Sequence, residues 1–518
     1  MSGPMTPNRN GKLIIPIAAG LALTAGTLAW AGGFFGGLFE VWGPRYTYSG
    51  DAAGLLLWSE PPPPLPDDAT NSVRRWNQVA MDANAIDHTP PAPDESRIFG
   101  EQLGPARTSR AFAIIHIAIF EAVNAIACTH QSYTGLPPAE ADTSPEAAIA
   151  QAAHDTLSAM FPSQTSRFDD LLGQDLGAIP DDTAKENGIA LGQRAAAAIL
   201  AQRADDGSDR PEPRIGVDFM TSNQPGKWRQ DPVSQNPLAL GAYWGQVRPF
   251  VLSSATQFRA GAPPPLASLP YTLAFNEVKA FGGDGVTTAT VRTPDQTMAA
   301  IYWGYDGTPG LGTPPRLYNQ IAVQIAWQMG SDAVELARLL ALVNVALADA
   351  AISCWESKYY FQFWRPIAGI RESDPGTGPT GAGDGNFLTL GDPNFTPLGA
   401  PASNLLGPNF TPPFPAYPSG HATFGGALFQ ILRNVYGTDS IAFTFVSDEF
   451  NGMTRDNQGR VRPRMARSFS SLSQAEEENG QGRIYLGIHW AFDKTAGIDQ
   501  GRRVADYVLS HAFVPLGY

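Results

Sequence analysis

The 518-residue chain contains only two cysteines, Cys128 and Cys354. Two thiols cannot build a disulfide scaffold, and a structural zinc site usually takes four cysteine or histidine ligands. The sequence therefore argues against both kinds of stabilisation. Cys354 lies in an apolar helical segment, where we expect it to be buried as packing.

Charged residues are also scarce, at 16% of the chain, and the formal net charge is −14 with no basic run. Such a chain is a poor binder of nucleic acid or of an anionic membrane surface. We therefore expect no nucleic-acid partner. The 43% of hydrophobic residues and the length allow a large core and two or more domains.

Long runs of alternating polar and apolar residues are scarce too, so we predict a mainly α protein with two helical bundles. The expected domains are residues 1–40 as a leader or membrane anchor, 41–330 as an N-terminal mainly helical region, and 331–518 as a C-terminal helical bundle that carries the functional site. The expected helices cover residues 109–127, 145–160, 183–203 and 421–436, and residues 332–364 form either one long helix or two nearly collinear ones. His116 is expected to be a packed core histidine and not a ligand.

The N-terminus carries a targeting signal. Arg9 and Lys12 precede an uncharged run over residues 13–39, in which residues 29–31 form a small-x-small cleavage site. We favour a cleaved secretory leader, with an uncleaved membrane anchor as the alternative. Either implies a secreted, periplasmic or membrane-anchored protein that works outside the cytoplasm. The proline-rich residues 61–66 indicate an extended linker.

Lys358 and Arg365 form the first of three blocks suited to an anion. They are seven residues apart, which places them nearly on one face of a helix about two turns apart. Pro366 should end that helix at Arg365. A solvated basic face is the simpler interpretation, but the neighbouring residues are too aromatic for it.

The second block is Ser419-Gly420-His421, at the start of a predicted helix that Gly437 ends. The first turn of a helix has unpaired N–H groups and a positive dipole end, which together bind anions. Gly420 allows close approach of the backbone, Ser419 adds a hydroxyl donor, and His421 can transfer protons at near-neutral pH. The simpler alternative is an N-cap serine beside a surface histidine.

Arg483, His489 and Asp493 form the third block. Gly482 and Gly487 indicate a helix start or bend that lets Arg483 and His489 converge, and Asp493 can orient the ring of His489 from the position i+4. A satisfied core histidine is the plainer interpretation of His489. The three blocks together predict a site for a tetrahedral oxyanion such as phosphate or vanadate.

The chain resembles the vanadium-dependent haloperoxidases and the type-2 phosphatidic acid phosphatase superfamily, and most closely the chloroperoxidase-like haloperoxidases. The resemblance is clear over residues 290–500. It departs from the superfamily pattern at Gly482, where serine is usual, and in the long interval between His421 and Arg483. The stretches that carry it are Trp355 to Lys358, Phe363 to Pro366, residues 412–426 and Arg483 to Trp490.

The resemblance implies vanadate as cofactor, and hydrogen peroxide, chloride or bromide, and an organic acceptor as substrates. His489 is implied as the vanadium ligand and His421 as the acid/base. Vanadate oxygens would be bound by Lys358, Arg365, Ser419, the Gly420 amide and Arg483. Asp306 is implied as the partner of Arg483, and Trp355 and Phe414 as the halide pocket, where bromide-restricted relatives tend to carry histidine in place of Phe414.

Three functions compete on the sequence. The favoured one is a vanadate-dependent haloperoxidase that oxidises bromide, and chloride as well, to hypohalous acid. The second is an acid phosphatase that uses His489 as nucleophile in the same oxyanion site. The third is a protein that binds an oxyanion without catalysis.

Two segments rich in loops are also expected. Residues 374–418 should wrap the mouth of the site. The charged residues 451–468 should form a surface loop or, less favoured, an anion-steering rim.

Overall fold

The structure is a computed structural model, and it describes residues 38–48, 68–92 and 95–517. The predicted leader or anchor lies outside the described residues except for its last three positions. The proline-rich linker lies outside them entirely. The division of the chain into domains stays a prediction.

Helices dominate the described residues, as predicted. The first half contains α2 (Leu38–Trp42), α4 (Ala69–Asp87), α5 (Gly104–Ala127), α6 (Pro145–Met160), η1 (Pro162–Gln164), α7 (Thr165–Gly177), α8 (Thr183–Arg203), η2 (Trp244–Gln246), α9 (Leu269–Phe281), α10 (Pro294–Tyr302) and α11 (Pro314–Met329). The second half contains α12 (Ala333–Phe361), α13 (Pro366–Arg371), α14 (Gly420–Tyr436), β1 (Phe443–Asn451), β2 (Arg464–Phe469), α15 (Leu472–Tyr485) and α16 (Ala491–His511).

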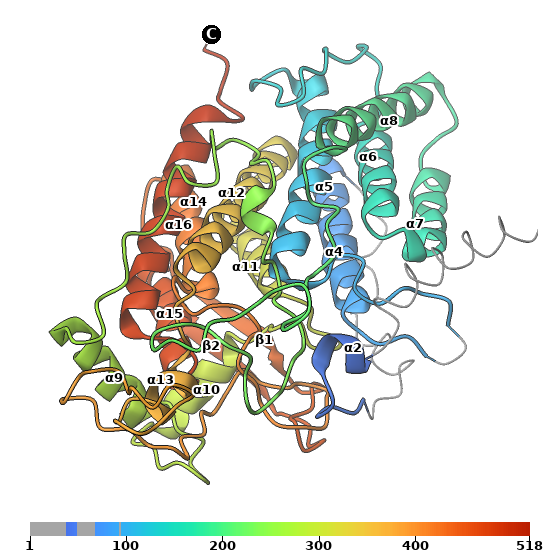
Figure 1. Cartoon of the computed structure of the whole chain (residues 1–518). Coiled ribbons are helices and arrows are strands. Elements are labelled where there is room, and N and C mark those ends of the chain that lie inside the picture. Colours follow the sequence, from blue (N-terminus) through green and yellow to red (C-terminus); the bar gives the residue numbers. More distant parts are fainter. Residues whose placement is uncertain (1–37, 49–67, 93–94, 518) are drawn as a thin grey trace, which may run out of the picture.

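The helices form two groups that meet at α12 (Figure 1). Helices α4 to α8 gather on one side, and α14 to α16 gather on the other. Helix α12 packs on α5 of the first group and on α14 and α16 of the second. The central helix therefore joins the two bundles.

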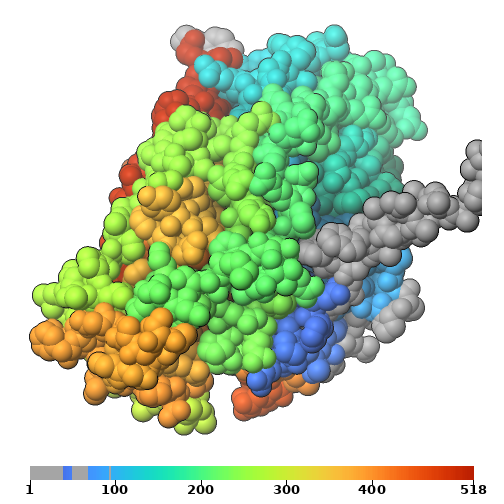
Figure 2. Space-filling view, viewed as in Figure 1, coloured from blue at the N-terminus to red at the C-terminus, as the bar shows by residue number. Residues whose placement is uncertain are grey.

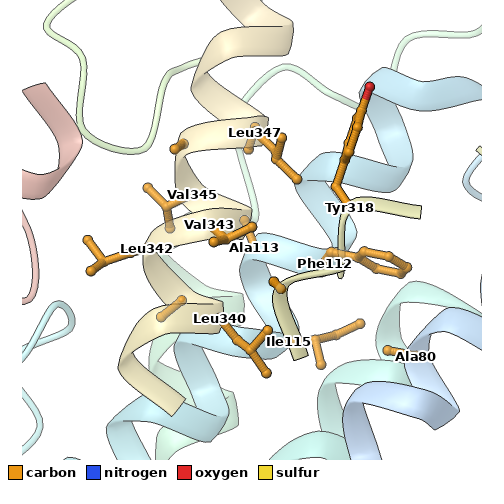
Figure 3. Packing of buried hydrophobic residues seen from close by; sticks show 14 of the residues in the cluster. Ala80, Phe112, Ala113, Ile115, Tyr318, Leu340, Leu342, Val343, Val345 and Leu347 are labelled. Atoms are coloured by element: carbon orange, nitrogen blue, oxygen red, sulfur yellow. The ribbon is translucent and has the colours of Figure 1, made fainter. Parts of the chain in front are cut away.

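The main hydrophobic core follows from this arrangement. Apolar side chains of α5 such as Phe112 and Ile115 face those of α12 such as Leu340 and Val343, and all four are fully buried (Figure 3). Both helices are apolar nearly all round, which is typical of a helix surrounded by protein. Among the described residues, α5 and α12 are also long and apolar enough to cross a membrane, but 83% and 94% of their most apolar windows are buried inside the protein.

The predicted helix ends are mostly confirmed. Ser144 caps α6, where its hydroxyl accepts the N–H of Ala147, and Gly437 ends α14 with a positive φ of 69°. His116 is confirmed as a packed core histidine, since its Nδ1 contacts the Phe112 carbonyl at 2.8 Å and its Nε2 contacts Asn77 at 2.9 Å. Cys354 is buried, as expected for a packed side chain.

The predicted helical span to Trp364 was too long. Helix α12 ends at Phe361, because Gln362 adopts a left-handed conformation with a φ of 50°. Pro366 does not end a helix but begins α13, at the position where its fixed φ and missing N–H are tolerated best. Lys358 and Arg365 therefore lie on different elements and converge through a turn of the chain, not through a shared helical face.

The prediction of a surface loop over residues 451–468 was partly wrong. An antiparallel hairpin of β1 and β2 occupies residues 443–469, with Phe443 opposite Phe469. Arg462 is buried against Glu449, and Arg467 pairs with Glu478 and Asp295. The hairpin occupies much of the long interval between His421 and Arg483.

The loop-rich segments cover one face of the molecule. Figure 2 shows residues around 200–290 in green beside residues around 375–415 in orange. The two segments contact one another, for example where Lys279 donates to the Leu390 carbonyl at 2.6 Å. Between Arg371 and Gly420 the chain has no helix or strand, which confirms the prediction of a long loop there.

Candidate active site

A cavity of about 60 Å³ lies between the two groups of helices. A water molecule needs roughly 10–15 Å³ measured in this way, so the cavity has room for several small groups. Seven of the predicted site residues line it: Asp306, Trp355, Phe414, Gly420, His421, Arg483 and His489. They come from four separate stretches of the chain, and the fold alone brings them together.

His489 follows the end of α15 and precedes α16. Gly487, with a φ of 73°, turns the chain between the two helices, as the sequence suggested. The Nδ1 of His489 lies 2.8 Å from Oδ2 of Asp493, which also accepts the backbone N–H of Trp490 at 3.0 Å. Because the carboxylate accepts, Nδ1 carries the ring proton and Nε2 presents a lone pair.

Arg365 donates a hydrogen bond to that lone pair. Its Nη1 donates to His489 Nε2 and to the Ile488 carbonyl, both at 2.8 Å. Burial and the neighbouring cations Arg365 and Lys358 lower the pKa of His489 well below its usual value. The imidazole is therefore neutral, the state in which it can bind a metal or attack an electrophile.

Lys358 is fully buried at the end of α12. Its Nζ donates to the carbonyls of Pro415, Ala416 and Pro418, so it braces the loop that leads into Ser419. Burial, reinforced by the charge of Arg365, lowers the pKa of Lys358 to about 7. Without a bound anion the charge of Lys358 is therefore only marginally stable.

The start of α14 has the features of an anion site. Ser419 occupies the N-cap position but makes no side-chain cap, and its buried hydroxyl has no hydrogen-bond partner among the described residues. The Gly420 amide belongs to the first turn, where helical N–H groups lack an internal partner. An added Cβ on Gly420 would lie 3.2 Å from the Trp355 ring, so this position is tightly packed.

Arg483 is held by Asp306 through two hydrogen bonds. Nη1 lies 3.0 Å from Oδ2, and Nη2 lies 2.6 Å from Oδ1. The pairing that the resemblance implied is therefore confirmed. The third nitrogen of the guanidinium, Nε, is buried and has no partner among the described residues.

His421 is fixed by a backbone carbonyl. Its Nε2 lies 2.7 Å from the Gly304 oxygen, and because a carbonyl can only accept, Nε2 carries the proton. Nδ1 is then the ring nitrogen left to take a proton in the cavity. Burial and the nearby charge of Arg483 lower the pKa of His421 to about 4, so the ring is neutral at pH 7.

Trp355 and Phe414 form an aromatic wall beside these groups. Their ring centroids are 5.0 Å apart, and the indole N–H of Trp355 donates to the Leu240 carbonyl at 3.1 Å. The Phe414 ring also lies 5.1 Å from both the Lys358 ammonium and the Arg365 guanidinium. Gly241 makes room for the indole, because a side chain there would collide with it.

The N-terminal region supplies a wall that the sequence analysis did not assign to the site. Its lining residues are Val41, Trp42, His88, Leu103, Gly104, Pro105, Asn236, Leu238 and Leu240. Most are apolar and spread over 200 residues, so no local motif marks them.

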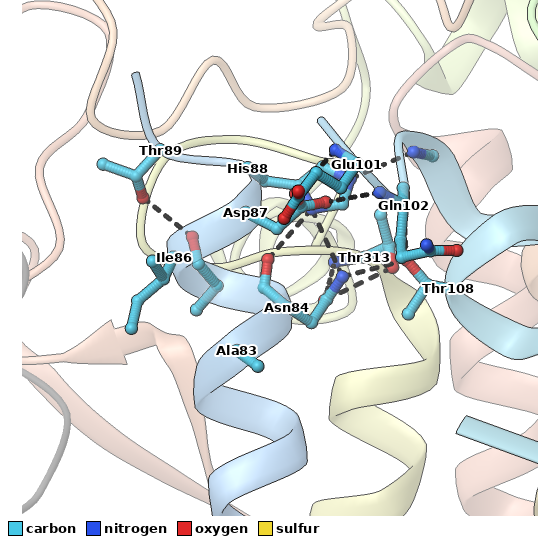
Figure 4. A network of polar contacts seen from close by, with 12 residues as sticks. Ala83, Asn84, Ile86, Asp87, His88, Thr89, Glu101, Gln102, Thr108 and Thr313 are labelled. Carbon is cyan, nitrogen blue, oxygen red and sulfur yellow. Dashed lines mark hydrogen bonds and ion pairs between the residues drawn. The ribbon is translucent and has the colours of Figure 1, made fainter. Parts of the chain in front are cut away.

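A hydrogen-bond network behind this wall makes it rigid (Figure 4). His88 contacts the Asn84 carbonyl through Nδ1 at 2.9 Å and accepts the Gly104 N–H through Nε2 at 3.0 Å. Asp87 accepts the backbone N–H groups of Glu101 and Gln102. Since both ring nitrogens of His88 are used internally, its role is to shape the cavity.

The residues present fit a tetrahedral oxyanion. Arg483 lines the cavity, while the buried cations Arg365 and Lys358 lie behind its wall, Arg365 against His489 and Lys358 against the loop that leads into Ser419. Two buried donors, Ser419 Oγ and Arg483 Nε, await an acceptor. Burying such groups is costly unless they are paired, so a bound oxyanion would complete the site. No group of three or more His, Cys, Asp or Glu suited to a metal cation exists among the described residues.

The fold and the donor set define a mainly helical protein with a buried oxyanion site, and the comparisons with known proteins place it among the vanadium-dependent haloperoxidases. Residues 338–515 match the family model of the VCPO second helical-bundle domain. Vanadium chloroperoxidase from Curvularia inaequalis is 30% identical in an alignment that covers 83% of this chain and 80% of that protein. The chain belongs to this chloroperoxidase-like family, whose members imply vanadate as the cofactor.

Solved structures share the fold. The first bacterial vanadium-dependent iodoperoxidase superimposes with a TM-score of 0.67 at 23% identity, over 86% of this chain and 97% of that one. An apo-type bacterial vanadium-dependent chloroperoxidase gives a TM-score of 0.59 at 16% identity, over 80% of this chain and 95% of that one. At these identities the likeness shows the mainly helical fold alone.

The predicted site residues thus converge, while their chemical roles stay predictions. Arg365 contacts His489, Ser419 precedes Gly420 at the start of α14, and Lys358 lies behind the same loop. What the sequence missed is the Gly304 carbonyl, a backbone group that no side-chain motif could reveal.

Proposed function

We propose that this protein oxidises bromide, and chloride as well, with hydrogen peroxide, and so delivers hypohalous acid to an organic acceptor. One observation carries the proposal. A neutral His421, whose Nε2 donates to the Gly304 carbonyl, lies in the same cavity as buried donors that have no acceptor among the described residues. Bound vanadate would supply Lewis-acid activation of peroxide.

The side chains would divide the work as follows. His489 Nε2 would ligate the metal once Arg365 Nη1 moves from the lone pair to an oxyanion oxygen. Arg483, Ser419 and the Gly420 amide would donate to further oxygens. Lys358 would join them as the added negative charge favours its protonated form.

His421 is suited to act as a base. With a pKa of about 4 it is neutral over most of the physiological range, and Nδ1 can take a proton from incoming peroxide. An acid phosphatase reaction in the same site would instead need a protonated His421 to serve the leaving group, and the assays described below separate the two reactions.

The aromatic wall supports the inclusion of chloride. Trp355 and Phe414 are buried, and they place apolar faces beside two cations, an environment that strips water from a small anion. A chloride ion held there would be close to the oxyanion cradle.

The decisive experiment measures bromination and chlorination of a dye by the purified protein, with and without orthovanadate, beside a phosphate-ester assay. We expect peroxide- and vanadate-dependent halogenation. His421→Ala should lower the turnover by about 10²–10⁴-fold and keep vanadate bound, while His489→Ala should lose both. Phosphate-ester hydrolysis without oxidation of either halide by the vanadate-loaded protein would overturn the proposal.

A further inference from the structure

Two contacts of the candidate site come from one short segment of the chain. The Gly304 carbonyl accepts from Nε2 of His421 at 2.7 Å, and Asp306, two residues later, binds Arg483. The backbone course of residues 302–306 therefore sets the ring of His421 and the guanidinium of Arg483 together.

Strand β1 holds this segment in place. The Ser447 hydroxyl donates to the Tyr302 carbonyl at 2.7 Å, and the Asp448 N–H donates to the Tyr305 hydroxyl at 2.7 Å. The Glu449 carboxylate accepts the Tyr305 N–H at 3.2 Å. Three consecutive residues of the hairpin thus bind three groups of the segment.

Glu449 is fully buried and is itself fixed. Its Oε2 accepts from the Ser403 hydroxyl and from Nη1 of Arg462, both at 2.6 Å. Burial raises the pKa of Glu449, and the charge of Arg462 opposes that shift. A side chain at Gly304 would collide with the carboxylate, which shows that the backbone of Gly304 lies directly against Glu449.

The backbone at Tyr305 requires such support. Its φ of 51° is left-handed, a conformation that is unfavourable for a bulky residue and persists only when the surroundings enforce it. The Tyr305 ring is fully buried, and its hydroxyl also donates to Gln320 at 3.0 Å. If Tyr305 relaxed to a negative φ, the Gly304 carbonyl and the Asp306 side chain would no longer point at their present partners.

We propose that Glu449 is a positioning residue which, with Tyr305, fixes residues 302–306 and thereby sets the tautomer of His421 and the direction of Arg483. The hairpin between α14 and α15 is then a support for the site, not an unrelated insertion. The inference deepens the proposed function, since it gives the proposed base its Nδ1 lone pair, but the geometry that it concerns does not depend on turnover.

The test compares Glu449→Ala with Glu449→Gln, which keeps an acceptor for the Tyr305 N–H. The first readout is ¹⁵N NMR of protein labelled in its seven histidines, with His421 assigned by the loss of its signals in His421→Ala. We expect a single tautomer protonated at Nε2 in the wild type, a mixture of tautomers in Glu449→Ala, and an intermediate result in Glu449→Gln.

The second readout is vanadate affinity by equilibrium dialysis. Loss of a group that orients a ligand-binding residue typically weakens metal binding 10–100-fold, and we expect a loss of at least about 10-fold in Glu449→Ala. If Glu449→Ala does not fold, Tyr305→Phe decides, because it removes only the hydroxyl that anchors the segment; we expect the same changes at smaller size.

Glu121→Ala is the matched control. Glu121 is also a buried glutamate that accepts a serine hydroxyl and a backbone N–H, from Ser132 and Tyr133. It lies 17 residues along α5 from Gly104 at the cavity, about 25 Å of helix. It should change stability but neither readout.

An unaltered His421 tautomer and an unaltered vanadate affinity in folded Glu449→Ala, or in Tyr305→Phe if that variant decides, would overturn the inference. Failure of the proposed function is a separate result. In that case the wild type would oxidise no halide, while the tautomer and the vanadate affinity would still respond to Glu449→Ala.

Discussion

Arg483 and Asp306 are 177 residues apart in sequence and form a two-pronged ion pair, with N–O distances of 2.6 and 3.0 Å. Both side chains are almost fully buried, at 1% and 5% exposure. The pair uses one N–H on each terminal nitrogen of the guanidinium, so the second N–H of each of these nitrogens and the Nε–H, which has no partner among the described residues, remain for an oxyanion. Asp306 therefore aims Arg483 and limits how it can bind vanadate.

Asp306→Asn should weaken vanadate binding by about 10–100-fold, because an amide keeps the shape of the pair but cannot accept both N–H groups as a carboxylate does. Equilibrium dialysis of vanadate measures this. Asp295→Asn is the control, since Asp295 pairs with Arg467 but is 69% exposed, and such surface pairs contribute little. Equal vanadate affinity in the two variants would contradict the role given to Asp306.

Ser419→Ala should separate binding from stability. Its hydroxyl is buried without a partner among the described residues, so its removal should leave the free energy of unfolding of the vanadate-free protein unchanged or slightly higher. Vanadate affinity should fall about 10-fold, for the loss of one charge-assisted hydrogen bond.

Ser373→Ala is the matched control for Ser419→Ala, because Ser373 is also buried and its hydroxyl has no partner among the described residues, but it is not adjacent to the cavity-lining Gly420. It should keep full vanadate affinity. Denaturant titration of the vanadate-free proteins measures the free energy of unfolding, and equilibrium dialysis measures the vanadate affinity. A clear loss of stability with unchanged affinity in Ser419→Ala would show that the serine is a structural residue.

Phe414→His should lower the rate of chloride oxidation by a larger factor than the rate of bromide oxidation. The change puts a polar, protonatable ring between Trp355 and the two cations, where an apolar wall would desolvate a bound halide in the proposed function. Chloride is the more strongly hydrated halide and the harder one to oxidise, so it depends more on this environment.

Phe414→Leu keeps the wall apolar and should preserve the ratio of the two halide rates. The measurement is the chlorination and bromination of the same dye by vanadate-saturated protein. An equal loss with both halides in Phe414→His would mean that the residue does not select between them.

A further prediction concerns the effect of His116 on the pH dependence of stability. Burial lowers the pKa of this core histidine from 6.5 to about 4, so between these values the unfolded chain binds a proton that the folded protein does not. Its contribution to stability is complete above pH 6.5 and is lost as the pH falls toward 4, at up to about 1.4 kcal/mol per pH unit.

His116→Gln should therefore reduce the slope of the free energy of unfolding against pH on the acid side by up to about 1.4 kcal/mol per pH unit, which corresponds to one bound proton. Urea titrations at several pH values between 4 and 7 measure the slope for both proteins. Activity should be unaffected, because His116 lies in α5 among core side chains and does not line the cavity. An unchanged slope would show that His116 is not the neutral buried group proposed here.

The sequence determined much of this protein on its own. Apolar periodicity and cap residues predicted α5, α6, α8 and α14 closely, because these signals act within a few residues of each other. Side chains such as His421 and His489 stood out because few chemistries need those residues at those spacings. The end of α12 was misjudged because Gln362, with its left-handed turn, leaves no mark in a hydrophobic pattern.

The tertiary structure decided the rest. The apolar N-terminal wall of the cavity, the Gly304 carbonyl on His421 and the support of Glu449 beneath Tyr305 all join residues far apart in the chain. The hydrophobic pattern of a sequence records which side chains are buried, but not which backbone carbonyl a buried ring will face. That choice is made by packing, and here it fixes which nitrogen of His421 is left to take a proton.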